Sequence, residues 1–161
     1  MKKMTLMALG LLALSGTLHA EGGKMNSVRQ QVQVESKDGK VIVQVSVENG
    51  SGKPVFVPKA AFQDKQLFRR TFEITDKTSG AELDYTGPMV KRGPYTKADY
   101  VEIKPGATRS NKIDITASYA FKPGKHSYQL AYTGDYLADV ARLDAGTPAP
   151  AATVTFSHTG K

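Results

Sequence analysis

Apolar and polar residues alternate along several short stretches of this chain, and this alternation is the clearest structural signal in the sequence. Residues 28–35 alternate through Val28, Gln30, Val32 and Val34, and residues 40–48 through Val41, Val43, Val45 and Val47. A period of two places such side chains on one face of an extended strand. The Asp38-Gly39 pair between the two stretches favours a tight turn with positive φ. The sequence therefore predicts an antiparallel hairpin over residues 28–48.

The rest of the chain continues as short alternating runs separated by glycine and proline turn signals. Strands are expected at residues 54–58, 72–75, 81–85, 99–104, 108–116, 126–133 and 153–157. Because prolines flank residues 54–58, we expect that strand at a sheet edge or at a crossover between sheets. A helical turn or crossing loop is expected in residues 59–70, a weak helix in 135–144 and a linker at 146–151. The pattern predicts an all-β, immunoglobulin-like antiparallel sandwich of about eight strands.

The first 20 residues have the pattern of a secretory signal peptide. Lys2 and Lys3 precede an apolar run from residue 4 to residue 18, and Ala20 ends a small-residue cleavage site. The run is too short for a lasting membrane span, and a buried N-terminal helix is the alternative. Cleavage after Ala20 would leave residues 21–161 as a single domain. The signal peptide predicts a periplasmic or secreted location. The chain has no cysteine, which for an exported domain suits a bacterial periplasm better than a eukaryotic extracellular space.

Residue patterns that carry enzyme chemistry are missing from the sequence. It contains no His-Glu-x-x-His pair, no Gly-x-Ser-x-Gly elbow, no cysteine nucleophile and no phosphate-binding glycine loop. The net charge is +7, but the basic residues are scattered and form no nucleic-acid-binding stripe. A carboxylate site built from Asp99, Asp114, Asp135 and Asp139 remains a weaker alternative. We therefore expect a monomeric binding protein with no cofactor or metal, rather than an enzyme.

One basic loop stands out as a binding candidate. Residues 87–94 read Gly-Pro-Met-Val-Lys-Arg-Gly-Pro, so glycine and proline bracket the loop at both ends. Such brackets favour a fixed, exposed bend. The residues predicted to contact a partner are Met89, Val90, Lys91, Arg92 and Tyr95. The alternative is that Lys91 and Arg92 form a solvated hairpin tip.

Several short elements recur here in an order and spacing known from one protein family. They are Phe72-x-Ile74, Tyr85-x-Gly87-Pro88-x-Val90-Lys91-Arg92, Asp99-Tyr100, Pro105-Gly106-Ala107-Thr108, Asp114-Ile115-x-x-x-Tyr119, and Gly124 ahead of Tyr128-x-Leu130-x-Tyr132. With these elements, residues 72–134 resemble the N-terminal prodomain of the deuterolysin-like (aspzincin) secreted zinc endopeptidases. In that family the prodomain covers the catalytic cleft, and a domain with the zinc motif follows it.

The resemblance implies a partner rather than a catalytic activity. This chain ends at Lys161 without a zinc motif, so we expect a stand-alone inhibitor, immunity protein or folding chaperone for a secreted zinc endopeptidase. The family's preference for lysine implies that Lys91 or Arg92 enters an acidic pocket, with Met89, Val90 and Tyr95 at its rim. The competing hypothesis is a periplasmic immunoglobulin-like adaptor or envelope-binding module. That module would accept a partner strand at an exposed edge such as residues 54–58.

Overall fold

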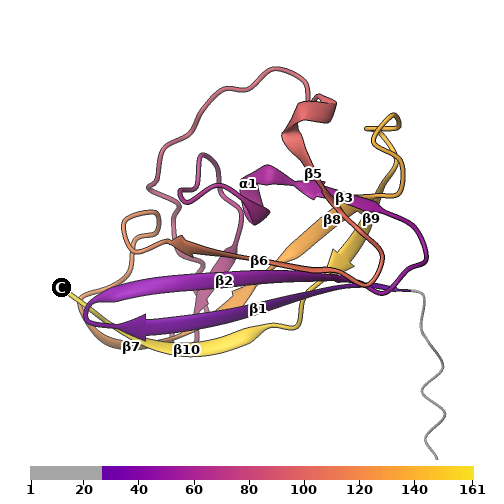
Figure 1. Ribbon diagram of the computed structural model, residues 1–161. Helices are drawn as coiled ribbons and strands as arrows, with labels where there is room; N and C mark the ends of the chain where they lie inside the picture. Colours follow the sequence, from indigo (N-terminus) through magenta and orange to yellow (C-terminus); the bar gives the residue numbers. More distant parts are fainter. Residues whose placement is uncertain (1–26) are drawn as a thin grey trace, which may run out of the picture.

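Ten strands and two single-turn helices make up the regular structure of residues 27–161, the part of the chain that the computed structural model describes (Figure 1). The elements are β1 (Val28–Lys37), β2 (Lys40–Asn49), β3 (Val55–Pro58), α1 (Lys59–Phe62), β4 (Glu73–Asp76), the 3₁₀ helix η1 (Lys97–Asp99), β5 (Tyr100–Ile103), β6 (Thr108–Asp114), β7 (Gly124–Ala131), β8 (Thr133–Leu137), β9 (Gly146–Pro150) and β10 (Val154–Gly160). They form antiparallel sheets ordered β1-β2-β6, β10-β7-β4 and β5-β3-β8-β9. The predicted all-β sandwich is confirmed, and its immunoglobulin-like character stays a prediction.

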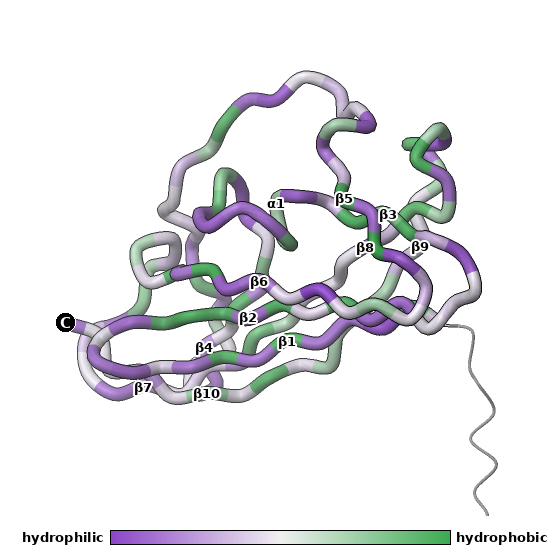
Figure 2. Tube along the Cα trace, in the orientation of Figure 1, coloured by the Kyte–Doolittle hydropathy of each residue, from purple (hydrophilic) through white to green (hydrophobic). Residues whose placement is uncertain are grey.

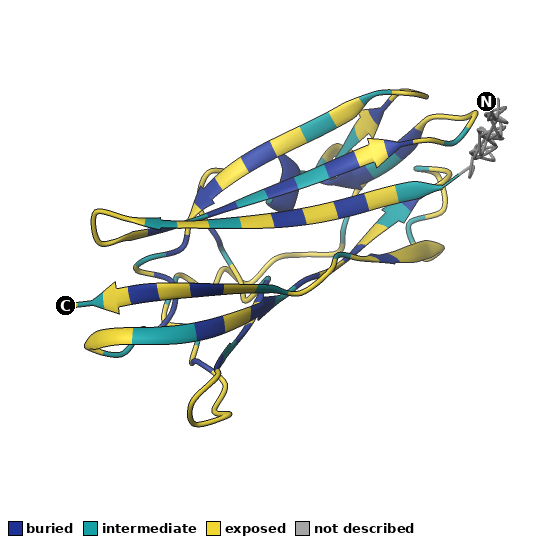
Figure 3. Ribbon diagram, turned by 90° about the horizontal axis from the view of Figure 1, so that it is seen from below, coloured by how far each residue is buried: buried dark blue, intermediate teal, exposed yellow. Residues whose placement is uncertain are grey.

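The hairpin of β1 and β2 forms as the sequence predicts. Val32 pairs with Val45 and Val34 with Val43, and the turn places Asp38 at φ 52° and Gly39 at φ 74°. The four alternating valines of β2 have no exposed surface. Alternation of buried and exposed residues follows the strands in Figure 3, and the matching hydropathy alternation is visible along β1 and β2 in Figure 2. The period of two thus fixes which face of this sheet enters the core.

A long bent hairpin joins the other two sheets. Leu130 of β7 pairs with Val154 of β10, and Thr133 of β8 pairs with Pro150 of β9. Between these pairs the β9–β10 side contains one more residue than the β7–β8 side. This extra residue is a β-bulge, which bends and twists the hairpin. The N–H of Ala151 donates to the carbonyl of Tyr132 at 3.0 Å and keeps the two halves of the hairpin connected.

Two predictions within this hairpin are wrong. Residues 146–151 are not a linker, because residues 146–150 form β9 at the edge of its sheet. Prolines are tolerated there because an edge strand has one side that needs no partner. Residues 135–144 are not a helix, because β8 extends to Leu137 and turns follow it. The helix was expected from the spacing of Leu137, Val140 and Leu143, but of these only Leu137 is fully buried, as a residue of β8.

The proline-flanked strand β3 does not lie at an edge. It pairs with β5 on one side and with β8 on the other, so the expected edge is an interior position. Pro54 precedes the strand and Pro58 is its last residue, so neither interrupts the middle of the ladder. The predicted crossover is confirmed, since β2 and β3 belong to different sheets. In residues 59–70 only one helical turn forms, α1, and the remainder is irregular.

The expected signal peptide lies outside the described residues. No helix within residues 27–161 has the length and apolar character needed to cross a membrane.

Candidate partner-binding loop and the pocket beneath it

The loop of residues 87–96 rises from a firmly held base. The N–H groups of Thr86 and Gly87 both donate to the carbonyl of Ser118, at 2.9 and 3.3 Å. The Tyr85 hydroxyl lies 2.8 Å from the carbonyl oxygen of Pro88 and 3.2 Å from that of Leu67. These contacts connect the start of the loop to two other segments of the sandwich. The entry to the loop is therefore fixed by backbone hydrogen bonds rather than by its own sequence alone.

A buried tyrosine supports that base from below. The ring of Tyr119 packs edge-on against Tyr85, with centroids 5.4 Å apart. Its hydroxyl accepts from the N–H of Phe72 at 2.9 Å and donates to the carbonyl of Phe72 at 2.7 Å. Burial is the main cause that raises the pKa of Tyr119, to about 12, so the hydroxyl stays protonated. A neutral hydroxyl can serve as donor and acceptor at once, which is what the two bonds to Phe72 require.

The tip of the loop presents apolar side chains to solvent. Met89 is 79% exposed and Val90 is 53% exposed, and these are the exposed large hydrophobic residues of the described chain. The N–H of Val90 donates to the carbonyl of Phe68 at 3.1 Å, so the backbone is anchored where the side chain is exposed. Exposed apolar side chains on a held backbone are typical of contact surfaces. Both residues were predicted to contact a partner, and their exposure is compatible with that role.

The two cations of the loop differ in their surroundings. Arg92 lies between two carboxylates, with 3.5 Å to Asp99 Oδ1 and 3.9 Å to Asp64 Oδ2. Asp99 is itself held by the N–H and hydroxyl of Thr96, and these bonds, helped by Arg92, lower the pKa of Asp99. Lys91 is exposed and has no hydrogen bond or ion pair within residues 27–161. The structure therefore separates two residues that the sequence left equivalent: Arg92 is paired and Lys91 is not.

Tyr95, near the end of the loop, packs against two other side chains. Its ring lies under the guanidinium of Arg69, with Arg69 Cζ 5.6 Å from the ring centroid, and 6.0 Å from the ring of Tyr100. Tyr95 is half-buried. It lines the same pocket as Val90 and Arg92, and its predicted contact with a partner stays a prediction.

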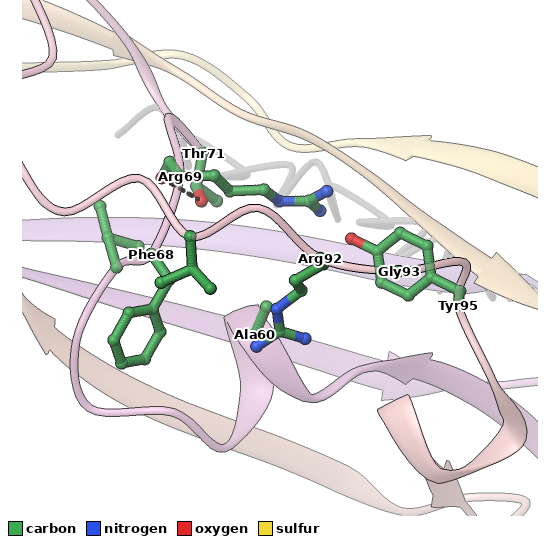
Figure 4. Close-up of a pocket in the computed structure, with 9 residues that line it drawn as sticks. Ala60, Phe68, Arg69, Thr71, Arg92, Gly93 and Tyr95 are labelled. Atoms are coloured by element: carbon green, nitrogen blue, oxygen red, sulfur yellow. Dashed lines mark hydrogen bonds between the residues drawn. The ribbon is translucent and has the colours of Figure 1, made fainter.

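A pocket of about 240 Å³ lies between the loop and the segment that follows α1 (Figure 4). It is lined by Ala60, Leu67, Phe68, Arg69, Thr71, Val90, Arg92, Gly93 and Tyr95. Three of the five predicted contact residues therefore line it, while Met89 and Lys91 do not. Sequence reasoning missed Arg69, whose only signal was an arginine pair at residues 69–70 in a segment expected to cross the sandwich.

Three of the acidic residues named as a possible carboxylate site have separate partners. Asp99 binds Thr96 and Arg92, Asp114 accepts from Thr116 and pairs with Lys40, and Asp139 accepts from the N–H of Ala141. His158 Nδ1 lies 2.9 Å from the Ser36 hydroxyl, and burial lowers the pKa of His158. Across residues 27–161 no three histidine, cysteine or acidic side chains gather in a group that could hold a metal ion.

Comparison with known proteins identifies no family for this chain. No family model matches the sequence, and no curated protein matches it. One solved structure, described as the X-ray structure of Northeast Structural Genomics Consortium target SoR45, aligns with a TM-score of 0.46 and 13% sequence identity. The alignment covers 84% of this chain and 88% of the other.

Proposed function

We propose that this chain is a binding protein that inserts the loop of residues 87–96 into the cleft of a secreted zinc endopeptidase, as an inhibitor, immunity protein or folding chaperone. The observation that carries the proposal is the exposed, unpaired Lys91 beside exposed Met89 and Val90, on a loop whose base and flank are hydrogen-bonded. The resemblance of residues 72–134 to an endopeptidase prodomain supports the choice of partner. An exported protein in the periplasm or outside the cell fits that partner.

The physical basis of the docking is a loop that is ordered before it binds. A segment already fixed by hydrogen bonds loses little conformational entropy on association. Lys91 acts as a substrate mimic whose ammonium group meets a carboxylate of the cleft, which contributes specificity more than affinity. Met89 and Val90 then cover apolar surface at the rim. Arg92, already paired with Asp64 and Asp99, keeps the loop in position rather than entering the cleft.

The proposal is tested by capture followed by inhibition. Protein starting at residue 21 is immobilised and exposed to periplasmic and secreted fractions of the source cells, and a captured zinc endopeptidase is assayed with increasing inhibitor. We expect Lys91→Met to weaken inhibition roughly thirtyfold, the size of an interface hot spot. Lys97→Met, which removes an exposed cation from η1 on the same side of the molecule, is the matched control and should change little.

Two outcomes would reject the proposal. Unchanged inhibition by Lys91→Met would reject the substrate-mimic role of the loop. Capture of envelope proteins without any peptidase would instead favour the adaptor hypothesis. That adaptor would need another contact surface than residues 54–58, because β3 has strand neighbours on both sides.

A further inference from the structure

We infer that the pocket beneath the loop is a binding site for a carboxylate carried on a small apolar group, such as the C-terminal residue of a peptide. The inference goes beyond the proposed function, because it concerns the inner side of the loop and not its tip. Of the three residues that carry the docking proposal, Val90 lines this pocket, whereas Met89 and the lysine that meets the cleft, Lys91, do not. The two ideas can therefore fail separately.

The first argument is an arginine without a counter-ion. Two arginines line the pocket, Arg69 and Arg92, and Arg92 pairs with Asp64 and Asp99. Arg70, the next residue along the chain, lines the neighbouring hollow and pairs with Glu82. Arg69 lines the pocket and has no carboxylate partner within residues 27–161. An unpaired guanidinium at a concave surface is the group that most readily accepts a carboxylate through two parallel hydrogen bonds.

The second argument is that Arg69 is held in a position to bind. Its guanidinium lies over the ring of Tyr95, 5.6 Å from the centroid, an arrangement that attracts a cation to the face of the ring. The guanidinium N–H groups of Arg69 have no hydrogen-bond acceptor within residues 27–161, so these donors are available to a ligand. The Thr71 hydroxyl donates to the carbonyl of Arg69 at 3.3 Å and braces the adjacent backbone. Figure 4 shows the Arg69 side chain extending toward the hydroxyl end of Tyr95.

The third argument is the shape and polarity of the pocket. Its volume of about 240 Å³ suits a group the size of one amino acid, below the range of drug-sized ligand sites. Ala60, Leu67 and Val90 give it apolar walls beside the cation. A neighbouring hollow of about 170 Å³ shares Arg69 but is also lined by Asp135, which repels an anion. The carboxylate is therefore expected on the Tyr95 side of Arg69.

The charge of the pocket distinguishes a carboxylate from a phosphate. Arg92 and its two acids together carry one net negative charge, and Arg69 is the one cation lining the pocket without an acid partner within residues 27–161. A monoanion matches the charge of Arg69, whereas a phosphate dianion would enter an apolar-walled pocket with one charge uncompensated, which is costly. The apolar walls in turn favour a ligand with an aliphatic stem over acetate.

The test is a ligand titration of isotopically labelled protein starting at residue 21, monitored by nuclear magnetic resonance. The probes are N-acetyl-leucine, its neutral amide, acetate and inorganic phosphate, and the reported signals are the backbone amides of Arg69, Thr71 and Tyr95. We expect N-acetyl-leucine to shift these signals at millimolar concentration and the amide not to shift them. Two peptides are then titrated, one ending in a free leucine carboxylate and one carrying an internal glutamate. Their binding shows whether the site prefers a chain end or an acidic side chain.

Matched arginine variants decide whether the effect is local. Arg69→Gln should weaken binding of N-acetyl-leucine roughly tenfold, as expected for loss of a charged hydrogen-bonding partner. Arg70→Gln removes the same charge one residue away and should leave binding nearly unchanged. Equal loss in both variants, equal binding of the neutral amide, stronger binding of phosphate, or no shift with any probe would overturn the inference. The spectrum of each variant without ligand reports whether it has folded.

Discussion

The turn around Lys122 and the loop around Lys91 both present basic side chains at the surface of the sandwich, but their lysines have different partners. Lys122 Nζ lies 2.7 Å from Asp76 Oδ2, and the Asp76 side chain is only 1% exposed. Lys91 has no such partner within residues 27–161, and its neighbours Met89 and Val90 are exposed. The net charge of a segment therefore does not reveal its role. A lysine that covers a buried carboxylate stabilises the fold, and an unpaired one is available to another molecule.

Asp76 is the centre of the first region. Its Oδ1 accepts from the N–H groups of Thr78 and Ser79, at 2.8 and 3.2 Å, which closes the turn after β4. Its Oδ2 accepts from Lys122 and lies 3.5 Å from His126 Nδ1. The hydrogen bond from Lys122, followed by those from the two backbone N–H groups, lowers the pKa of Asp76 to about 2. One carboxylate thus connects the turn after β4 to the start of β7.

The largest expected effect is the loss of this carboxylate. Asp76→Asn keeps the shape of the side chain but removes its charge and replaces one acceptor oxygen with an NH₂ group. Either Lys122 or the N–H groups of Thr78 and Ser79 then lose their acceptor. The Asp76 side chain is only 1% exposed, and leaving hydrogen-bond donors at such a site without their acceptor is destabilising. We expect this variant to lower the midpoint of urea unfolding more than any other substitution discussed here. Asp84→Asn is the control, since Asp84 is exposed, and an equal loss in both variants would contradict the assignment.

The second prediction concerns acid. The pKa of Asp76 is about 2 in the folded protein and 3.8 in its ordinary state. Above pH 3.8 the carboxylate is ionised in both states, and its stabilising contribution is complete. Between pH 3.8 and about 2 the unfolded chain takes up a proton first, so the contribution is lost as the pH falls. Urea unfolding measured across this range should show a smaller acid-dependent loss in Asp76→Asn than in the wild type; an identical loss would remove Asp76 as its source.

The sequence could predict those parts of the fold that depend on local signals. The hairpin of β1 and β2 follows from alternating valines and the Asp38-Gly39 turn, and both signals lie within the hairpin itself. Strand β9 was missed because its Pro148 and Pro150 are typical of a linker. Only the pairing with β8, at an edge where missing N–H groups need no partner, makes a strand possible there.

At the candidate site, too, the sequence predicted what depends on local signals but not which side chains pair with one another. Glycine and proline around the loop predicted its exposure, and Met89 and Val90 are indeed exposed. The pairing of Arg92 with Asp64 and Asp99 was not predictable, because Asp64 belongs to a distant segment that meets the loop only in the folded chain. Arg69 was overlooked for the same reason. Its position over Tyr95 arises from tertiary packing and corresponds to no recognisable spacing of residues in the sequence.

A smaller effect is expected at the base of the binding loop. A Cβ added at Gly87 would lie 2.6 Å from the Tyr85 hydroxyl, so Gly87→Ala must displace that hydroxyl from the carbonyl of Pro88. Loss of one such hydrogen bond costs about 1 kcal/mol of unfolding free energy. Gly93→Ala is the matched control, because no atom lies within 4 Å of a Cβ there. Equal stability of the two variants in urea unfolding would show that Tyr85 does not hold the loop.

The smallest effect on stability is expected from the residue proposed to matter most for binding. Lys91→Met should change the free energy of unfolding by less than about 0.5 kcal/mol, as is usual for exposed sites without special contacts. The same substitution at Lys122 should destabilise the fold, because it leaves the buried carboxylate of Asp76 without its cation. Urea unfolding of the two variants side by side therefore tests the comparison directly. A loss of stability in Lys91→Met as large as in Lys122→Met would mean that Lys91 has a structural partner, and the loop would no longer be a candidate for docking.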